Sequence, residues 1–446
     1  MPSIRVRPAS STEGAAYLDH PRFSACTVPI VWYPMWNANL AHFFRDNAAK
    51  VWGVLRDTPW ARNVKWVMVT AEGHAAPQMN HDIMQPLVSQ QVETWADFTN
   101  RLPSSKVNGG FVPADGGEGG ADSLPPSFEG GPQRCFRRMF VCNRGINITS
   151  WPLHGLGQGL AAHYAGAVQL TAAAQATSHA LESATAQAAS QVLESAAAVA
   201  AAQKQPNQAA AHKRPDKAAR DVAKPAMLPT NSSAGSEQVL RIIFHKRASA
   251  DRQLLNADEL VKSCNAWRHT AADGRRLRAS CTEVEMADLF TGIAAAQQAD
   301  VFVGVHGANM ANAWLMRPGS SMIELQPFGF DSGAAHLQYP LFNLEDKDSE
   351  VLWWLISVCD PQAWTPGTSE AAGEGHPAMH SKFRNLVVRW QALQTVLEAV
   401  VDANGNMTDY RQRWAAGRWW WFMGSGGSMK TAGRGRRTKM RCPASD

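Results

Sequence analysis

A run of six residues constrains this chain most: Asp300-Val301-Phe302-Val303-Gly304-Val305, followed at once by His306-Gly307-Ala308. An almost uninterrupted apolar run rich in valine is typical of a strand that is buried on both faces of a parallel sheet. Parallel strands need crossover connections, which are usually helices. The run therefore predicts an α/β fold for this part of the chain.

Strands and helices alternate around that run. Towards the carboxyl terminus we predict strands at residues 239–245, 276–281, 300–305 and 321–325, and helices at residues 286–298, 310–316 and 382–401. A further helix is predicted to start at Asn256, because Glu259 follows it at capping-box spacing. Towards the amino terminus we predict strands at residues 27–33, 64–69 and 135–142, and helices at residues 39–55 and 92–102. This alternation of strands and helices is the signature of an α/β fold.

Two stretches interrupt the pattern. Residues 104–133 are rich in Gly, Pro, Ser and Asp, which is typical of an exposed loop. Residues 157–237 are dominated by Ala, Gln and Ser and have no clear apolar stripe, so nothing directs them to pack. We therefore divide the chain into an amino-terminal domain (20–150), a low-complexity linker (151–237), a carboxyl-terminal domain (238–402) and a basic tail (403–446).

The turn after residues 300–305 is the first candidate site. Small residues at Gly307 and Ala308 let an anion approach the amides of Gly307 to Asn309, and a helix start carries partial positive charge. His306 can hydrogen-bond the same group. The alternative is a packing turn with a buried histidine.

Three more side chains lie at or near expected strand ends. Arg247 and Arg252 follow the strand at residues 239–245, and their guanidinium groups suit phosphate oxygens. Glu324 lies between apolar neighbours on the next strand, where a carboxylate needs a partner. Ribose hydroxyls of a nucleotide or an internal salt bridge would each supply one.

A second candidate cluster lies in the amino-terminal domain. Asn39, His42 and Asp46 are spaced so that they share one face of the predicted helix. His42 oriented by Asp46, or Asp46 itself, can act as a base towards a hydroxyl group. A helix cap with a buried polar cluster is the alternative.

Together, these features resemble glycosyltransferase family 61, which includes O-linked N-acetylglucosaminyltransferases and plant xylosyl- and arabinosyltransferases. Four segments carry the resemblance, and they occur in the expected order. They are Asn39-x-x-His42-x-x-x-Asp46, Arg247-x-x-x-x-Arg252-Gln253-Leu254-Leu255-Asn256, Ala299 to Ala308, and Arg317-Pro318-Gly319 leading to Ile323-Glu324-Leu325. The third segment is the most specific. The resemblance covers most of the chain outside the linker and the tail.

The resemblance implies two Rossmann-like domains facing a cleft (the GT-B arrangement), with a nucleotide-sugar donor, such as a UDP-sugar, held by the second. It implies inverting transfer to a hydroxyl of a protein or polysaccharide without a metal or other cofactor. Donor contacts would come from Arg247, Arg252, Glu324 and residues 306–309. His42 or Asp46 would be the base, and Asn39 would lie on the acceptor side. The implied partners are the donor and a glycan or glycoprotein acceptor, with no nucleic acid.

Two other functions stay open. A metal-dependent transferase would use an Asp-x-Asp motif, and Asp346-Lys347-Asp348 has that form, although residues 341–350 have the character of an acidic surface loop. A family-like module could also bind a glycan or nucleotide without turnover. Asn309 stands where the family usually has glycine, and Thr291-Gly292 stands where members often carry Glu-Gln.

Composition bears on location and partners. Much of the net charge of +5 comes from the tail, and such ends are usually solvated rather than bound to nucleic acid. The seven cysteines lack zinc-site spacing and permit one or two disulfides. Sequons start at Asn147, Asn231 and Asn406. No signal peptide or membrane anchor is visible, whereas family members work in the lumen of the Golgi or endoplasmic reticulum, where we expect this chain too.

Overall fold

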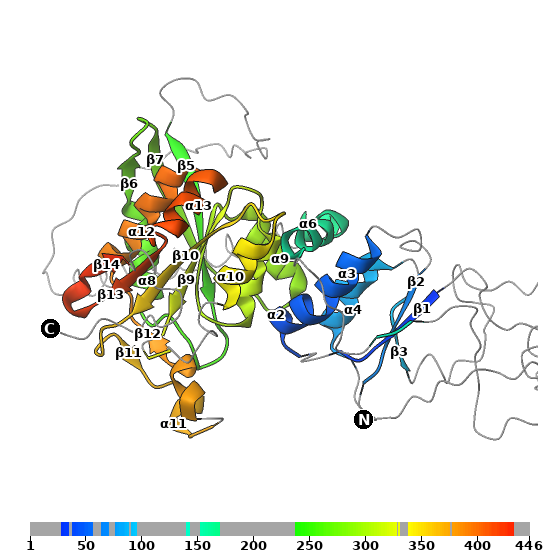
Figure 1. The fold of residues 1–446 in the computed structure, drawn as a ribbon. Coiled ribbons are helices and arrows are strands. Elements are labelled where there is room, and N and C mark those ends of the chain that lie inside the picture. Colours follow the sequence, from blue (N-terminus) through cyan, green and yellow to red (C-terminus); the bar gives the residue numbers. More distant parts are fainter. Residues whose placement is uncertain are drawn as a thin grey trace, which may run out of the picture.

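The computed structural model describes residues 28–34, 38–56, 64–70, 76–88, 91–95, 140–142, 152–169, 237–327, 329–330, 338–374 and 377–431. It is a mixed α/β fold with two parallel-rich sheets, as Figure 1 shows. The predicted α/β class is confirmed. The arrangement of two domains facing a cleft stays a prediction.

The smaller sheet is formed by the amino-terminal part of the chain. It contains β1 (Val28–Trp32), β2 (Val64–Met68), β3 (Glu93–Thr94) and β4 (Phe140–Cys142). Their order is β3-β2-β1-β4, and every pairing is parallel. Three of these strands match predicted ones. Because Glu93–Thr94 is a strand, the helix predicted from residue 92 does not start there.

The helices of this part follow β1 and β2. A continuous helical segment comprises α2 (Leu40–His42), the π-helix η1 (Phe43–Ala49) and α3 (Lys50–Leu55), in place of one predicted α-helix. After β2 come α4 (Gln78–Met84) and the short η2 (Gln85–Leu87). The buried Asn47 accepts a hydrogen bond from Trp32 Nε1 at 2.7 Å. This bond ties η1 to the carboxyl end of β1.

The larger sheet has eight strands in the order β14-β13-β10-β9-β8-β5-β7-β6. The strands are β5 (Gln238–Lys246), β6 (Arg268–Thr270), β7 (Arg276–Glu285), β8 (Val301–Val305), β9 (Ser321–Gln326), β10 (Leu352–Val358), β13 (Trp420–Met423) and β14 (Met429–Thr431). Only β6 and β14, at the two edges, pair antiparallel. All residues of β8, β9 and β10 are buried, as expected for central strands.

Helices lie on both sides of this sheet (Figure 1). They are α8 (Ala257–Ala266), α9 (Leu289–Gln298), the 3₁₀-helix η3 (Ala308–Leu315), α10 (Gln338–Glu345), α12 (Trp390–Ala403) and α13 (Met407–Ala415). Between β10 and α12 the chain forms β11 (Trp364–Thr365), α11 (Thr368–Ala371), η5 (Pro377–Phe383) and β12 (Asn385–Leu386), and η6 (Ser425–Gly427) precedes β14.

The order of the parallel strands contains one reversal. After β5 the chain forms β7 on one side and then crosses back to form β8 on the other side of β5. In open α/β sheets, ligands bind outside the carboxyl ends of the strands at such a reversal. The carboxyl ends of β5 and β8 are therefore the place where this sheet favours a ligand site.

Part of the predicted linker belongs to the folded core. The helix α6 (Leu153–His163) lies within it, and Leu153, Leu156 and Leu160 are fully buried. A Cβ atom on Gly157 would overlap the backbone carbonyl of Trp314, so α6 packs directly against η3. We expected the alanine-rich stretch to have no face that packs, and this is wrong for α6. Its leucines form a short apolar face, and the glycines between them allow η3 to approach closely. Residues 170–236 lie outside the described part.

The predicted basic tail is also shorter than expected. α13 packs Tyr410 into the core, and β13 pairs parallel with β10. The large sheet therefore continues to Thr431, because Trp419 to Met423 are buried and β14 pairs with β13. The arginines that suggested a tail, from Arg434 onward, lie outside the described residues.

Two local predictions need correction. The side chain of Asn256 does not cap α8 but hydrogen-bonds the backbone of Val388 in both directions. The expected acidic surface loop at residues 341–350 is correct only for its second half: residues 341–345 belong to α10, whereas Lys347, Asp348 and Glu350 lie exposed in the turn that follows. Asp346 is buried and accepts a hydrogen bond of 2.7 Å from the backbone N–H of His154, which fixes α6 to α10.

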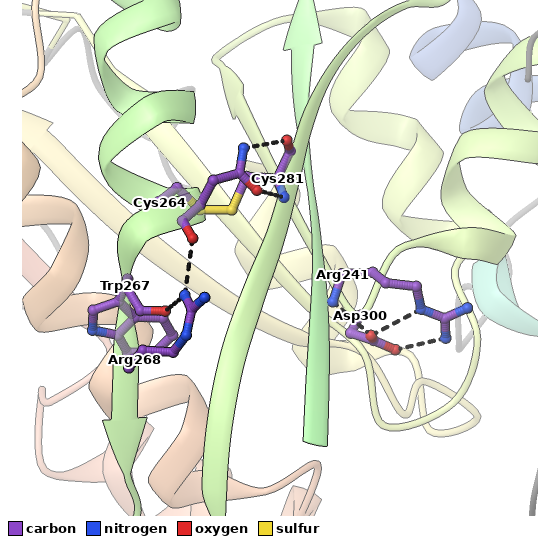
Figure 2. The surroundings of a disulfide bond; sticks show 7 residues. Arg241, Cys264, Trp267, Arg268, Cys281 and Asp300 are labelled. Carbon is purple, nitrogen blue, oxygen red and sulfur yellow. Dashed lines mark hydrogen bonds and ion pairs between the residues drawn. A yellow bond between two sulfur atoms is a disulfide. The ribbon is translucent and has the colours of Figure 1, made fainter. Parts of the chain in front are cut away.

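A disulfide links α8 to β7, between Cys264 and Cys281 (Figure 2). Asn265 strengthens the same junction, because its side chain hydrogen-bonds both the N–H and the C=O of Cys281. Cys359 is disulfide-bonded as well. The structure thus confirms that disulfides form in this chain.

Candidate functional site

The carboxyl ends of β5 and β8 bring the predicted donor residues together. His245 lies near the end of β5, and Arg247 follows it. His306 and Gly307 directly follow β8. Met310 N donates to Gly307 O at 3.0 Å as η3 begins. The amides of Ala308 and Asn309 therefore come before the first donor of the helix and point out of its amino-terminal end.

Both predicted arginines converge on Gly307. A Cβ atom at this position would lie 2.7 Å from Arg252 Nη1 and 2.8 Å from Arg247 Nη1. Gly307 also has φ of 157°. A side chain here would displace the two guanidinium groups, so glycine is what lets both of them approach the turn.

The two guanidinium groups are short of partners. Arg247 Nε and Nη1 and Arg252 Nε are buried without a hydrogen-bond acceptor, and no described carboxylate lies within ion-pair distance of either group. Burial lowers the pKa of Arg247 to about 10, and the charge of Arg252 adds to the effect. Burial also lowers the pKa of Arg252. Because these two guanidinium groups lie close together and have no carboxylate partner among the described residues, their charges favour the binding of a ligand with several negative oxygens.

The loop that carries Arg252 is fixed by its backbone and by its neighbour. Arg252 has φ of 59°, and its N–H donates to Phe383 O at 3.2 Å. Asp251 accepts from Ser369 N at 3.0 Å and from Ser369 Oγ at 2.6 Å. Asp251 is therefore held by Ser369 rather than paired with the arginine beside it.

This backbone contact brings a third cation to the site. Lys382 precedes Phe383, and its Nζ lies 4.7 Å from the centre of the Phe383 ring, with the Arg252 guanidinium 6.0 Å from the same centre. Burial lowers the pKa of Lys382, and the charge of Arg252 adds to this. Lys382 is 130 residues from Arg252 in the sequence, and no sequence motif links the two positions, so their proximity could not be predicted from the sequence.

His245 lies beside the arginines as a neutral group. Burial lowers the pKa of this imidazole to about 3, and Arg247 and Arg252 act in the same direction. Asn309 Nδ2 donates to His245 Nε2 at 2.9 Å. The side chain of Asn309 is thus directed to His245, which leaves its backbone N–H as the group that can meet a ligand.

His306 is held by a buried carboxylate. Its Nδ1 hydrogen-bonds Glu324 Oε1, and Trp353 Nε1 donates to Glu324 Oε2 at 2.8 Å. Glu324 is fully buried, so both oxygens already have partners inside the protein. This does not fit the expected contact of Glu324 with a ribose. An internal partner satisfies the carboxylate instead, and it orients His306.

The predicted base cluster forms at the start of the first helical segment. His42 Nδ1 lies 2.8 Å from Asp46 Oδ2, and Arg45 binds Asp46 through Nε at 2.6 Å and Nη2 at 2.5 Å. Burial opposes ionisation of Asp46, but the hydrogen bonds from His42 and Arg45 outweigh it and lower the pKa. Asp46 is therefore an ionised carboxylate, already engaged by a cation.

His42 Nδ1 has a second neighbour, because Arg45 Nη2 lies 3.0 Å away. In the tautomer with a proton on Nδ1, that proton is donated to the ionised Asp46. The lone pair then lies on Nε2. Asn39 contributes to the same arrangement through its Oδ1, which accepts from His42 N at 3.1 Å and caps α2.

Tyr339 connects the two clusters. Its ring lies 5.5 Å from that of His306, and Arg45 stacks over the nearby Phe342 at 4.7 Å. Burial raises the pKa of Tyr339 above its usual range, and the charges of Glu324, Arg45, Arg252 and Asp46 all act on it. Both candidate clusters are thus close enough to one buried phenol to affect it. Sequence analysis did not single out Arg45 or Tyr339.

The opposite edge of the sheet has a different character. A cavity of about 270 Å³ lies there, lined by the amino-terminal ends of β5 and β9. Arg317 lines it and donates to Asp300 at 2.5 Å. The Arg317-Pro318-Gly319 segment therefore supports the sheet and is not part of the donor cluster. Among the described residues, no group of three or more His, Cys, Asp or Glu side chains is placed to hold a metal ion.

One known protein family matches the part of the chain that carries these residues. A family model described as Glycosyltransferase 61 matches residues 41–323, more than half of the chain. The match includes His42, Asp46, both arginines and the turn after β8. No curated protein matches the chain significantly. None of the helices in the described part has the length and apolar character needed to cross a bilayer. The chain belongs to glycosyltransferase family 61.

Proposed function

We propose that this chain transfers a sugar from a nucleotide-sugar donor, most suitably a UDP-sugar, to a hydroxyl group of a protein or polysaccharide. One observation carries the proposal: Arg247 and Arg252 converge on Gly307 without an anionic partner among the described residues. A pyrophosphate supplies several acceptor oxygens and the negative charge that this cluster needs.

In this proposal the pyrophosphate lies against the amides of Ala308 and Asn309 and between the guanidinium groups. Lys382 adds a third positive charge from the side of Phe383. His306, held at Nδ1 by Glu324, presents Nε2 to the phosphate oxygens or the adjoining ribose. Glu324 then acts through His306 as a positioning residue.

The base in this proposal is His42 rather than Asp46. An ionised carboxylate bound by Arg45 is a weak base, whereas the Nε2 lone pair of His42 can accept a proton. The acceptor oxygen loses its proton to Nε2 and forms a bond to the anomeric carbon. The bond from that carbon to the pyrophosphate oxygen breaks, and the nucleoside diphosphate leaves. Attack from the face opposite the leaving group inverts the configuration.

Fixed cations take the role that a divalent ion has in metal-dependent transferases. Arg247, Arg252 and Lys382 can stabilise the charge that develops on the leaving pyrophosphate without reorganising. We therefore expect the transfer rate to be unchanged when a chelator removes divalent ions. A loss of activity that added Mg²⁺ or Mn²⁺ restores would contradict this part of the proposal.

The test starts with a thermal-shift screen of nucleotide sugars, because a ligand that binds only the folded state raises its stability. Release of nucleoside diphosphate from each stabilising donor is then measured, with and without candidate acceptors. The Arg252→Ala and His306→Ala variants should lose both binding and release, and His42→Ala should lose release but keep binding. If the native protein binds a donor and never releases diphosphate, it is a binding module rather than an enzyme.

A further inference from the structure

We infer that Asn406 is a site of N-linked glycosylation. Asn406-Met407-Thr408 is a sequon with threonine at its third position and no proline. It is the one sequon among the described residues, because those at Asn147 and Asn231 fall outside them. The acceptor atom would be the side-chain nitrogen Nδ2 of Asn406.

The fold presents this asparagine at a sharp, exposed corner. α12 ends at Ala403, the next two residues, Asn404 and Gly405, have φ of 48° and 68°, and α13 begins directly after Asn406. Asn406 and Thr408 are both exposed. A bulky, hydrophilic glycan is accommodated at such a surface turn without displacing packed side chains.

The side chain of Asn406 uses only one of its two polar atoms in the fold. Oδ1 accepts hydrogen bonds from Thr408 N at 2.9 Å and Asp409 N at 3.1 Å, as the cap of α13. Nδ2 makes no hydrogen bond to any described residue. The cap thus directs Oδ1 to the helix and leaves Nδ2 on the side away from it, where a sugar can be attached.

The disulfides supply the second, independent line of evidence. Cys264 and Cys281 are buried and bonded, and Cys359 is bonded as well. Structural disulfides form in oxidising compartments such as the lumen of the endoplasmic reticulum. The same compartment carries out N-glycosylation, so a chain that acquires these disulfides there meets the modifying enzyme.

The glycan would also be clear of the candidate site. A Cβ atom on Gly405 would lie 2.9 Å from the carbonyl oxygen of Gly319, which precedes β9. Asn406 is therefore near the amino-terminal edge of the large sheet, whereas the arginine cluster lies at its carboxyl-terminal edge. A glycan here is compatible with access to the donor site.

The modification itself needs a lipid-diphosphate-linked oligosaccharide as co-reactant. The bond between the sugar's anomeric carbon and the diphosphate oxygen breaks, and a bond from that carbon to Nδ2 forms. One amide proton leaves, and the lipid diphosphate is released. The capping role of Oδ1 is unaffected, so α13 keeps its first turn.

The test expresses the full chain in the secretory pathway of a eukaryotic host, confirms the Cys264–Cys281 bond, and treats the protein with peptide N-glycosidase in ¹⁸O-water. This treatment converts a glycosylated asparagine to ¹⁸O-labelled aspartate, which peptide mass spectrometry assigns to one position. We expect the label at Asn406 in wild type and in Thr408→Ser, and none in Thr408→Ala.

The control variants separate loss of the glycan from loss of the helix cap. Asn406→Asp removes the acceptor nitrogen and keeps a carboxylate cap, so its melting temperature should equal that of the enzymatically deglycosylated wild type, whereas Asn406→Ala should melt lower. An unlabelled Asn406 in the disulfide-bonded chain overturns the proposal, and so does a chain recovered with Cys264 and Cys281 reduced. Neither readout depends on transferase activity.

Discussion

Replacing Arg247 with methionine should stabilise the ligand-free protein while abolishing its function. Methionine keeps an unbranched apolar stem but removes a charge that has no carboxylate of the described residues within ion-pair distance. Burial and Arg252 lower the pKa of Arg247 to about 10. For a base whose pKa falls on folding, the cost is fully present below the folded-state pKa, declines as the pH rises above it, and disappears once the pH passes the unfolded-state pKa. At pH 7 the folded protein therefore bears the whole cost.

The difference between a pKa of about 10 and the usual arginine value corresponds to about 3 kcal/mol of disfavoured charge. Solvent screens part of this, so we expect a net gain of about 1–2 kcal/mol in the free energy of unfolding. The assay is urea denaturation at pH 7, repeated with a saturating nucleoside diphosphate. Ligand at a hundred times its Kd should add about 2.7 kcal/mol to the wild type and far less to Arg247→Met.

Arg384→Met is the matched control. Arg384 is also partly buried, but it binds Glu370 through Nε at 3.0 Å and Nη2 at 2.8 Å. Its removal should cost about 2 kcal/mol, because it leaves a carboxylate without its partner. The reasoning is refuted if Arg247→Met is less stable than wild type without ligand, or if it keeps the full stabilisation by nucleoside diphosphate.

Three further variants test other parts of the account. His42→Gln should lower kcat by about 10²–10⁴-fold with little change in the KM for donor, since it removes the base but no donor contact; an unchanged kcat would exclude His42 as the base. Glu324→Gln should lower kcat about 10–100-fold through loss of a charged hydrogen bond to His306, and full activity would show that the carboxylate does not position the imidazole. Gly157→Ala should destabilise the fold by about 1–3 kcal/mol in urea denaturation, because the added methyl group overlaps the Trp314 carbonyl; unchanged stability would mean that α6 does not pack as described.

The site could be predicted where local chemistry and strand order act together. The apolar run of β8 and the turn at Gly307 can be recognised from the sequence, because a central strand and an anion-binding turn each have a local signature. Convergence of Arg247 and Arg252 on Gly307 depends on β5 and β8 being neighbours. The resemblance to the family implied that these arginines and the turn form one site. The periodicity of the sequence alone does not predict their convergence.

Other features depend on contacts between distant segments. The carboxylate of Glu324 could find a ribose or an internal partner, and only the packing of Trp353 and His306 around it selects the second. Lys382 reaches the cluster through a backbone hydrogen bond between Arg252 and Phe383. α6 lies in an alanine-rich stretch, and its few buried leucines are a weak pattern until η3 is present as a partner.

The most direct test of the central claim is a crystal structure of this protein with a nucleoside diphosphate bound in the absence of divalent ions. The account predicts pyrophosphate oxygens within about 3 Å of both Arg247 and Arg252 and of the amides that follow Gly307. A pyrophosphate bound in the cavity beside Arg317, or arginines that stay without an anion while the nucleotide binds elsewhere, would contradict it.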